Sequence, residues 1–313
     1  MKTPDLPKIK GFATHLRKEI RGQDDALLTI TDHVERAELG LTDETQPKGA
    51  FLFVGPTGVG KTESTLQFTD YFFGRESLAR FDMSEFKELG SITAFLRRIQ
   101  TALKLGCRVI LFDEMEKASK EIHDLFLQMI DAARITFADD SVGDLRNTYL
   151  IFTSNIGAKE AMGSITRNRV AFEKTIKAKL AKELRPEFIG RYERAGGIVI
   201  FDRLSADSQL EVAEVSIRRM EKRMAALGFP LALTEQAKTY VFRNGFHPDY
   251  GARPLLGVLN KGVEGALRDA IFNGTYLTGS SGEIHVAQGG SRLEYRVVKT
   301  EAIPASNALP VVA

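Results

Sequence analysis

The segment GPTGVGKT at residues 55–62 has the composition and spacing of a phosphate-binding loop. Its glycines allow backbone N–H groups to turn toward phosphate oxygens, and a helix that begins at its end adds a favourable dipole. Lys61 is expected to reach the β- and γ-phosphates, and the Thr62 hydroxyl to ligate Mg²⁺. A chance glycine-rich turn is disfavoured, because an apolar strand-like run precedes the segment and a helical pattern follows it. We therefore predict an ATP and Mg²⁺ site that includes Gly55, Pro56, Thr57, Gly58, Val59, Gly60, Lys61 and Thr62.

Two acids, Asp113 and Glu114, directly follow the apolar run VILF. The carboxyl ends of parallel strands line the ligand crevice of a sheet, so both acids would face the phosphate loop. Asp113 is expected to hold Mg²⁺, and Glu114 to orient and deprotonate the attacking water. Alone, the pattern would indicate a helix cap at Asp113. Combined with the phosphate loop, it predicts hydrolysis of ATP.

Asn155 ends a further apolar run, YLIFTSN. Its amide could contact the γ-phosphate or the attacking water, or it could be a turn asparagine that follows a strand. The residues alone leave both possibilities open.

Short apolar runs separated by helical patterns predict a parallel sheet that is covered by helices on both faces, an α/β fold. Strands are expected at residues 50–54, 79–81, 108–112, 149–152 and 197–201. Residues 1–48 are expected to form a helical lead-in, with Ile20, Leu27, Leu28 and Val34 on one face. Helical patterns separate most of these strands, for example at Ile122, Leu125, Phe126, Met129 and Ile130.

A different pattern follows Asp202. Residues 205–227 have helical spacing with a stop at Gly228, and further helices are expected at 235–243 and 255–272. Strands at 283–287 and 293–298 would form a hairpin. In the first helix, alternating spacings of three and four connect Leu210, Ala213, Ile217, Met220, Met224 and Leu227. We predict a nucleotide-binding domain at 1–203, a smaller, mostly helical domain at 204–300, and a disordered tail at 301–313.

The composition limits the compartment and the partners. The single cysteine, Cys107, excludes an internal disulfide and suits a reducing compartment, where it is expected to be a small buried hydrophobe. No apolar stretch approaches the ~20 residues that span a bilayer, and the first residues lack the apolar core of a signal peptide. The formal net charge is +2, which does not favour nucleic acid as a partner. We expect a cytoplasmic protein without a membrane partner.

Six segments together resemble the second, C-terminal ATPase module of the Clp chaperones, in particular ClpB-type disaggregases, within the AAA+ superfamily. They are GPTGVGKT, FDMSEF, VILFDE, RNTYLIFTSN, RPEFIGR and YGARPL, and the resemblance extends from about residue 20 to residue 267. It implies an ATPase that forms a homo-oligomeric, hexameric ring with nucleotide bound between subunits.

The resemblance also implies roles for residues that the pattern alone does not single out. Asn155 would sense the γ-phosphate, Arg191 would be the arginine finger on the neighbour's nucleotide, and Arg253 would be a second sensor. Ile20, in the segment IRGQ, would pack against adenine. Without the resemblance, Arg191 and Arg253 would be interpreted as solvated or ion-paired surface residues.

The sequence departs from this family where Clp modules carry a loop that grips the threaded polypeptide, usually Gly-Tyr-Val-Gly. Residues 87–107 are shorter than the family's segment, contain no tyrosine, and predict one amphipathic helix with Phe95 in the core. The second pore-facing loop, 136–146, is acidic, with Asp139, Asp140 and Asp144. The sequence contains no N-terminal substrate domain, first ATPase module or coiled-coil insertion, and no peptidase-docking tripeptide is recognised.

Three functions are therefore weighed. A Clp-like chaperone or protein remodeller ranks first, because the relatives of this motor work on proteins. An ATPase that serves as a non-threading scaffold or switch for a partner is the alternative. A nucleic-acid loader is the third, and the near-neutral charge disfavours it.

Overall fold

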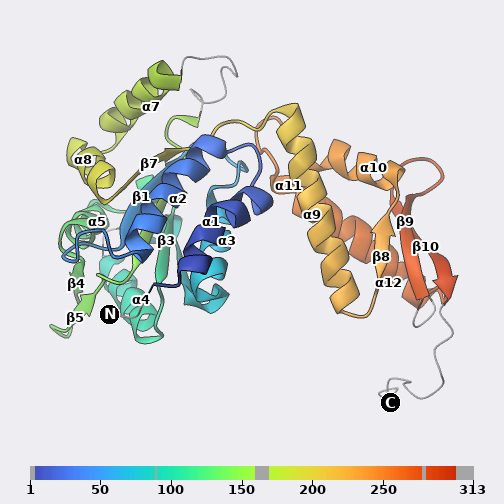
Figure 1. Cartoon of the computed structure of the whole chain (residues 1–313), viewed down its shortest axis with the longest axis horizontal. Coiled ribbons are helices and arrows are strands. Elements are labelled where there is room, and N and C mark those ends of the chain that lie inside the picture. The colour runs from blue at the N-terminus through green and yellow to red at the C-terminus, as the bar shows by residue number, and fades with distance from the viewer. Residues whose placement is uncertain (1–3, 89, 159–168, 277–279, 301–313) are drawn as a thin grey trace. The chain divides into compact units, whose positions relative to one another are not determined.

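The computed structural model describes residues 4–88, 90–158, 169–276 and 280–300 (Figure 1). It divides into two compact units, Met1–Arg203 and Leu204–Ala313. The predicted tail at 301–313 lies outside the described residues. Within the described part of the chain, no helix is both long and apolar enough to cross a membrane.

A five-stranded parallel sheet forms the centre of the first unit, in the order β2-β3-β6-β1-β7. The third and fourth strands of this order, β6 and β1, are buried along their whole length, which explains their apolar sequences without polar alternation. The predicted parallel sheet is thus confirmed. Its strands are β1 (Gly49–Val54), β2 (Leu78–Asp82), β3 (Val109–Asp113), β6 (Tyr149–Ser154) and β7 (Gly196–Ile200).

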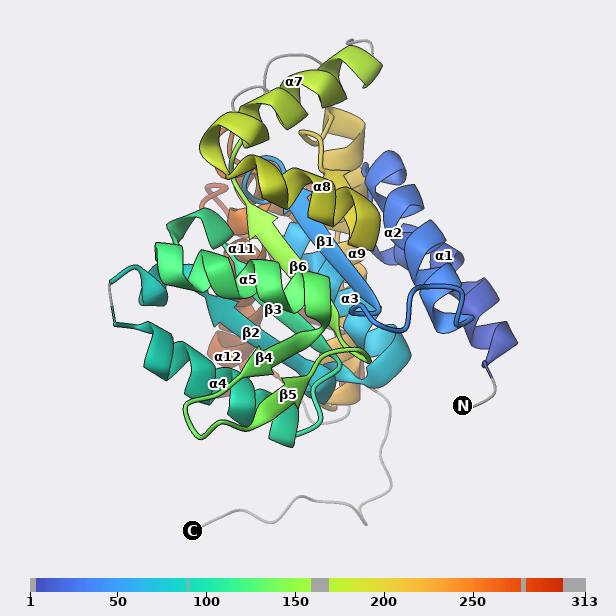
Figure 2. The same ribbon diagram turned by 90° about the vertical axis from the view of Figure 1, so that its left-hand side faces the viewer.

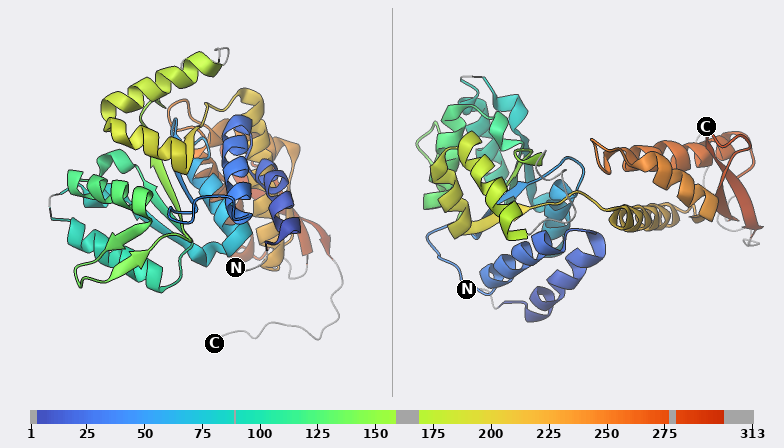
Figure 3. Two further views of the ribbon diagram at one scale, coloured as in Figure 1. Left: turned by 60° about the vertical axis from the view of Figure 1, so that its left-hand side comes forward. Right: turned by 90° about the horizontal axis from the view of Figure 1, so that it is seen from above.

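Helices cover both faces of this sheet and form two separate apolar cores. One core packs α1 (Leu6–Glu19), α2 (Asp24–Glu38) and α3 (Lys61–Phe73) against the sheet, and Figure 3 shows α1 and α2 side by side. The other involves α4 (Ile92–Lys104), α5 (Lys120–Ala132), α7 (Arg169–Glu183) and α8 (Pro186–Ala195). Figure 2 shows α4, α5 and α8 in front of the sheet. Short 3₁₀ turns, η1 (Arg75–Ser77), η2 (Met83–Phe86) and η3 (Met115–Lys117), border β2 and β3.

Two predictions about these helices have different outcomes. The predicted amphipathic helix within residues 87–107 is confirmed as α4, and Phe95 is fully buried in the core. The prediction that Leu28 shares one face with Leu27 and Val34 is wrong, because Leu28 is 57% exposed while the other two residues are buried. Leu28 lies one position after Leu27, which turns it about 100° around the helix toward solvent.

The acidic segment 136–146 lies mostly in a β hairpin of residues 134–144, and the turn between its strands carries Asp139 and Asp140. Strands β4 (Arg134–Thr136) and β5 (Val142–Asp144) pair antiparallel. Asp140, near its tip, has a positive φ of 59°, and its carboxylate neighbours are exposed. Strands this short carry too few alternating residues for their period to be visible in the sequence.

The second unit combines helices with a three-stranded sheet in the order β10-β9-β8. The predicted hairpin is confirmed as β9 (Ser280–Val286) and β10 (Leu293–Thr300), whereas β8 (Leu231–Leu233) was not expected. Leu210 and Leu227 are 47% and 62% exposed, although they share the helical spacing of buried residues such as Met220. The predicted helix at 255–272 is interrupted by a π turn, η4. The helical elements are α9 (Ala206–Ala226), α10 (Glu235–Gly245), α11 (Arg253–Leu259), η4 (Asn260–Glu264) and α12 (Gly265–Phe272).

Candidate nucleotide site

The phosphate loop connects the end of β1 to the start of α3. Gly55, Gly58 and Gly60 have φ values of 141°, 73° and 110°, a region in which side chains are strained. A Cβ atom at Gly55 would also lie 2.3 Å from the backbone oxygen of Phe201. The loop conformation therefore requires glycine at these positions, and it places Lys61 and Thr62 in the first turn of α3, where backbone N–H groups favour anions.

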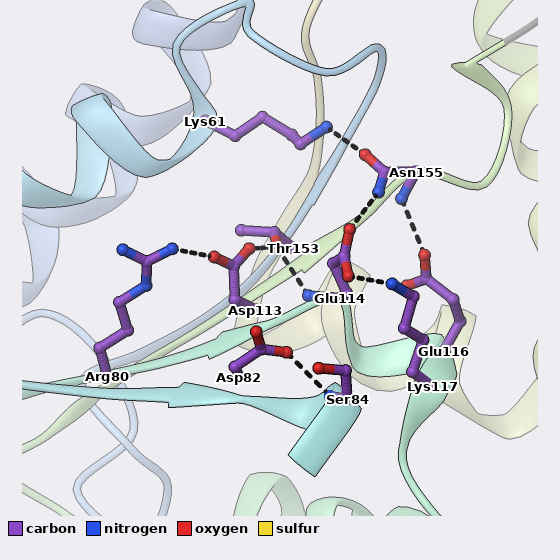
Figure 4. Close-up of polar contacts among 10 residues, drawn as sticks. All are labelled: Lys61, Arg80, Asp82, Ser84, Asp113, Glu114, Glu116, Lys117, Thr153 and Asn155. Atoms are coloured by element: carbon purple, nitrogen blue, oxygen red, sulfur yellow. Dashed lines mark hydrogen bonds and ion pairs between the residues drawn. The ribbon is translucent and has the colours of Figure 1, made fainter. Parts of the chain in front are cut away.

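Lys61 is buried, with 8% of its surface exposed, and its ammonium group lies against the loop (Figure 4). Nζ donates to the backbone oxygens of Gly55 at 2.5 Å and Pro56 at 2.9 Å. It also donates to Oδ1 of Asn155 at 3.1 Å. Phosphate oxygens can replace such acceptors, so this lysine fits the predicted contact with a nucleotide.

Asp113 is the last residue of β3, and two neighbouring strands fix its carboxylate. Thr153 on β6 donates its hydroxyl to Oδ1 at 2.5 Å, and Arg80 on β2 donates Nη2 to Oδ2 at 2.6 Å. The parallel register that pairs Phe112 with Phe152 brings the next residues, Asp113 and Thr153, together. The oxygen donors of Thr62 and Asp113 suit Mg²⁺, which takes few protein ligands beside substrate phosphates.

Glu114 leaves the strand direction with a φ of 57°, a left-handed conformation that is uncommon for residues other than glycine. Its backbone N–H donates to the Thr153 hydroxyl at 3.0 Å, which fixes this turn. The carboxylate accepts from Nδ2 of Asn155 at 3.0 Å and forms an ion pair with Lys117. The hydrogen bond from Lys117 to Glu114 is the main reason that the pKa of Lys117 is raised.

Asn155 connects the phosphate loop with the acids. Besides its amide contacts with Lys61 and Glu114, its backbone N–H donates to Oε1 of Glu116 at 3.1 Å. One side chain thus contacts both the lysine and the candidate base, which a simple turn asparagine would not require.

The lead-in to α2 borders the other side of the loop. Ile20, the residue after α1, is 6% exposed, and its Cγ2 would lie 3.8 Å from a Cβ built on Gly60. Gln23, 3% exposed, donates Nε2 to the backbone oxygens of Val59 at 3.2 Å and Asp202 at 2.9 Å. Its Oε1 accepts from the backbone N–H of Asp202 at 2.9 Å. The amide of Gln23 therefore joins the phosphate loop to the segment after β7.

The two predicted trans-acting or sensing arginines lie on other helices. Arg191 lies on α8 and forms an ion pair with Asp131 of α5. Arg253 is an exposed residue at the start of α11, in the second unit. Their assigned roles remain predictions.

Several residues at the site were not singled out by the sequence pattern: Arg80, Glu116, Lys117 and Thr153. Thr153 is two residues before Asn155 in the same strand, but its importance depends on the β3–β6 register, which only the structure gives. Gln23 belongs to the segment IRGQ, but its link to Asp202 joins residues far apart in the sequence and is visible only in the structure.

Two known sequence families match the chain: an AAA domain of the Cdc48 subfamily over residues 46–195, and the C-terminal D2-small domain of ClpB over residues 204–286. Among curated proteins, the chain is similar to the ATP-dependent Clp protease ATP-binding subunit ClpC of Staphylococcus saprophyticus, with 31% identity over 309 residues, 91% of this chain and 37% of that protein.

It is also similar to the chaperone protein ClpB of Aquifex aeolicus, with 36% identity over 298 residues, 88% of this chain and 29% of that protein. A third relative is the chaperone protein ClpB of Corynebacterium diphtheriae, with 33% identity, 90% of this chain and 33% of that protein. The chain thus spans about a third of the length of these relatives.

Proposed function

The chain belongs to the AAA+ ATPases, homologous to the second ATPase module of ClpB and ClpC, and we propose on this premise that it hydrolyses ATP to remodel other proteins. The proposal includes ATP and Mg²⁺ as ligands, a homo-oligomeric, hexameric ring, and a cytoplasmic location. The observation that carries it is the cluster in which Asn155 contacts both Lys61 and Glu114.

Each residue of the cluster has a distinct part in hydrolysis. Lys61 exchanges the loop carbonyl oxygens for oxygens of the β- and γ-phosphates. The Asn155 amide has two N–H donors, so Nδ2 can keep its bond to Glu114 and donate its second hydrogen to the γ-phosphate. Glu114 accepts a proton from the attacking water. At the same time the oxygen of the water bonds to the γ-phosphorus, and the bond from the γ-phosphorus to the leaving ADP breaks. Thr62 and Asp113 would hold Mg²⁺, which neutralises charge on the phosphates when bound. Thr153 keeps the two acids in register by contacting both.

Ring formation is supported by the family and by the position of Arg191. The guanidinium lies outside the subunit's own cluster, on a helix whose surface is open to a neighbour. A guanidinium delivered in trans stabilises charge on the γ-phosphoryl oxygens and contributes about 10³–10⁵ in rate in comparable enzymes. We propose the same for Arg191, and a sensing role for Arg253.

The way in which a polypeptide is held differs from the family pattern. Phe95 is the one aromatic residue among positions 87–107 and is fully buried in the core, so α4 offers no aromatic grip to a substrate. Remodelling by this chain is therefore proposed to need contact elsewhere, or a partner that presents the substrate.

Phosphate release from ATP, measured together with oligomer mass, tests the proposed activity. The wild-type protein is expected to release phosphate only with Mg²⁺ present and to assemble when nucleotide is added. Lys61→Ala serves as the matched control. It removes the expected contact with the phosphates, while the glycines that determine the loop conformation stay in place. Equal turnover in the two proteins would refute the assignment of the site.

A mixing experiment tests the role of Arg191. Arg191→Ala subunits keep an intact phosphate loop, and Lys61→Ala subunits keep an intact Arg191. Some interfaces in mixed rings therefore pair an intact phosphate loop with an intact Arg191 of the neighbouring subunit. The turnover of the mixture is expected to rise above that of either variant. Mixed rings that form but stay as inactive as their parents would contradict action in trans.

A further inference from the structure

Two contacts within its own subunit fix the guanidinium of Arg191. Nε donates to Oδ2 of Asp131 at 2.5 Å, and Nη1 donates to the backbone oxygen of Glu187 at 3.0 Å. An arginine has five N–H donors, and these two contacts occupy only part of them. The guanidinium is thus held at two of its three nitrogens, while further N–H donors remain for an anion.

The carboxylate that holds Arg191 is fixed as well. Oδ1 of Asp131 accepts from Nη2 of Arg194 at 3.0 Å, so both of its oxygens are bonded to α8. Asp131 lies on α5, which packs against α8, and the rings of His123 on α5 and Phe188 on α8 meet with their centroids 5.8 Å apart. A rigid helix pair therefore determines where this carboxylate points.

The same region is open to the outside of the subunit. Arg191 and Asp131 line a shallow surface depression together with Gln46, Glu187 and Gly190. A Cβ atom at Gly190 would meet no atom within 4 Å, so no other part of the described chain packs on this side of the backbone next to Arg191. The side chain of Arg191 is 27% exposed. It is thus both held in one orientation and reachable by a neighbouring molecule.

We propose that Asp131 is a positioning residue, which presents Arg191 to the nucleotide of the neighbouring subunit. This inference rests on the proposed function, in which Arg191 acts in trans. A finger contributes only when it reaches the phosphoryl oxygens in the correct geometry, and a misplacement of about 1 Å costs about 10²-fold in rate. A carboxylate on a rigid helix removes this freedom from a long, flexible side chain.

The chain offers a matched control on the same helix. Asp124, also on α5, forms an ion pair with Arg185, directly before α8, with a donor–acceptor distance of 2.5 Å. Asp124→Asn therefore breaks an α5–α8 ion pair of the same chemistry without touching Arg191. Any general effect of weakening this helix pair should appear in both variants.

The test compares Asp131→Asn with Asp124→Asn in steady-state ATP hydrolysis. Asp131→Asn is expected to lower kcat by about 10- to 100-fold, with KM and oligomer mass unchanged, since its own phosphate loop is intact. Asp124→Asn is expected to stay within about twofold of wild type, as for other exposed ion pairs. Added Lys61→Ala subunits should raise turnover per Asp131→Asn subunit, because they supply well-positioned fingers, and should have no such effect on Asp124→Asn.

A double variant provides an independent measurement. If Asp131 acts through Arg191, then adding Asp131→Asn to Arg191→Ala should cause no further loss, whereas independent effects would multiply. If Asp131→Asn does not assemble, Asp131→Glu keeps the charge but shifts the carboxylate by one methylene group, and it should show the same loss of kcat and the same rescue.

The outcomes separate this inference from the function on which it rests. Wild-type turnover in Arg191→Ala would refute the finger, and the role of Asp131 with it. If Arg191→Ala is inactive while the single Asp131 variants behave like Asp124→Asn, only the role of Asp131 is overturned. A loss that Lys61→Ala subunits do not rescue would place the role of Asp131 inside its own subunit and also overturn it.

Discussion

Replacing Glu114 by glutamine should remove the proton acceptor while leaving the site nearly intact. The glutamine Oε1 can still accept from Asn155, so the 3.0 Å contact is retained. The ion pair with Lys117 loses its charge, but the two side chains are 24% and 41% exposed. Partly exposed pairs of this kind contribute about 0.2–1 kcal/mol to the free energy of unfolding.

The expected loss of turnover is much larger than that. General-base catalysis contributes about 10²–10⁴ in rate, which corresponds to about 3–5 kcal/mol of transition-state stabilisation. Glu114→Gln should therefore show strongly reduced phosphate release, with nucleotide affinity near that of wild type and a melting temperature within about 2–4 °C of it. This difference between kcat and binding identifies a group that acts in the chemical step.

The measurement combines steady-state phosphate release with direct titration of labelled ATP. Glu116→Gln is the comparison, because it makes the same chemical change in the same turn and also contacts Asn155, through the backbone N–H. We expect a clearly smaller loss for Glu116→Gln. Equal losses in both variants would mean that the turn positions Asn155 and that Glu114 is not the base, and wild-type turnover in Glu114→Gln would remove Glu114 from the mechanism.

Further predictions concern the substrate grip, the cysteine, a histidine and the core. Without a partner, the protein should hydrolyse ATP yet leave a stably folded fluorescent reporter with an unstructured tail fluorescent; efficient unfolding would indicate that another segment, such as the β4–β5 hairpin, grips the chain. Burial raises the pKa of Cys107 to about 11, so its reaction with a thiol reagent at pH 8 should be slow until the protein unfolds, and fast labelling of folded protein would contradict this. Burial also lowers the pKa of His33; the unfolded state then binds more protons, so stability should be full above about pH 6.5 and fall as the pH drops below it. His33→Gln should reduce that slope in denaturant titrations followed by far-UV circular dichroism, and an unchanged slope would exclude this role. Phe95→Ala should lower the free energy of unfolding of the first unit by about 3–5 kcal/mol, measured in the same way, and a loss below about 1 kcal/mol would show that the ring is not an essential part of the core.

The parallel sheet and the order of the motifs were predictable because their causes are local. An apolar run such as VILF must be buried on both sides, and a glycine loop between strand and helix has few other uses. The side-chain contacts that hold the carboxylate of Asp113 in place were not predictable in this way. Arg80 and Thr153 reach Asp113 only because β2, β3 and β6 are neighbours in one register, and this pairing joins residues far apart in the sequence.

Helical spacing alone does not decide which apolar residues of a helix face the core. Leu28, Leu210 and Leu227 satisfy the spacing approximately and yet are exposed. The width of a buried stripe depends on the neighbouring element, which the sequence of the helix itself does not contain. The hairpin β4–β5 and the strand β8 were missed because each strand has only three residues.

The buried position of Lys61 has a consequence for the energetics of nucleotide binding. The residue is 8% exposed, and its ammonium group is bonded to acceptors from the loop and from Asn155. A charged group loses most of its water when it is buried, and here that dehydration takes place as the protein folds. A nucleotide that reaches the loop therefore exchanges one set of oxygen acceptors for another, and the free energy of its binding contains no term for stripping water from this cation.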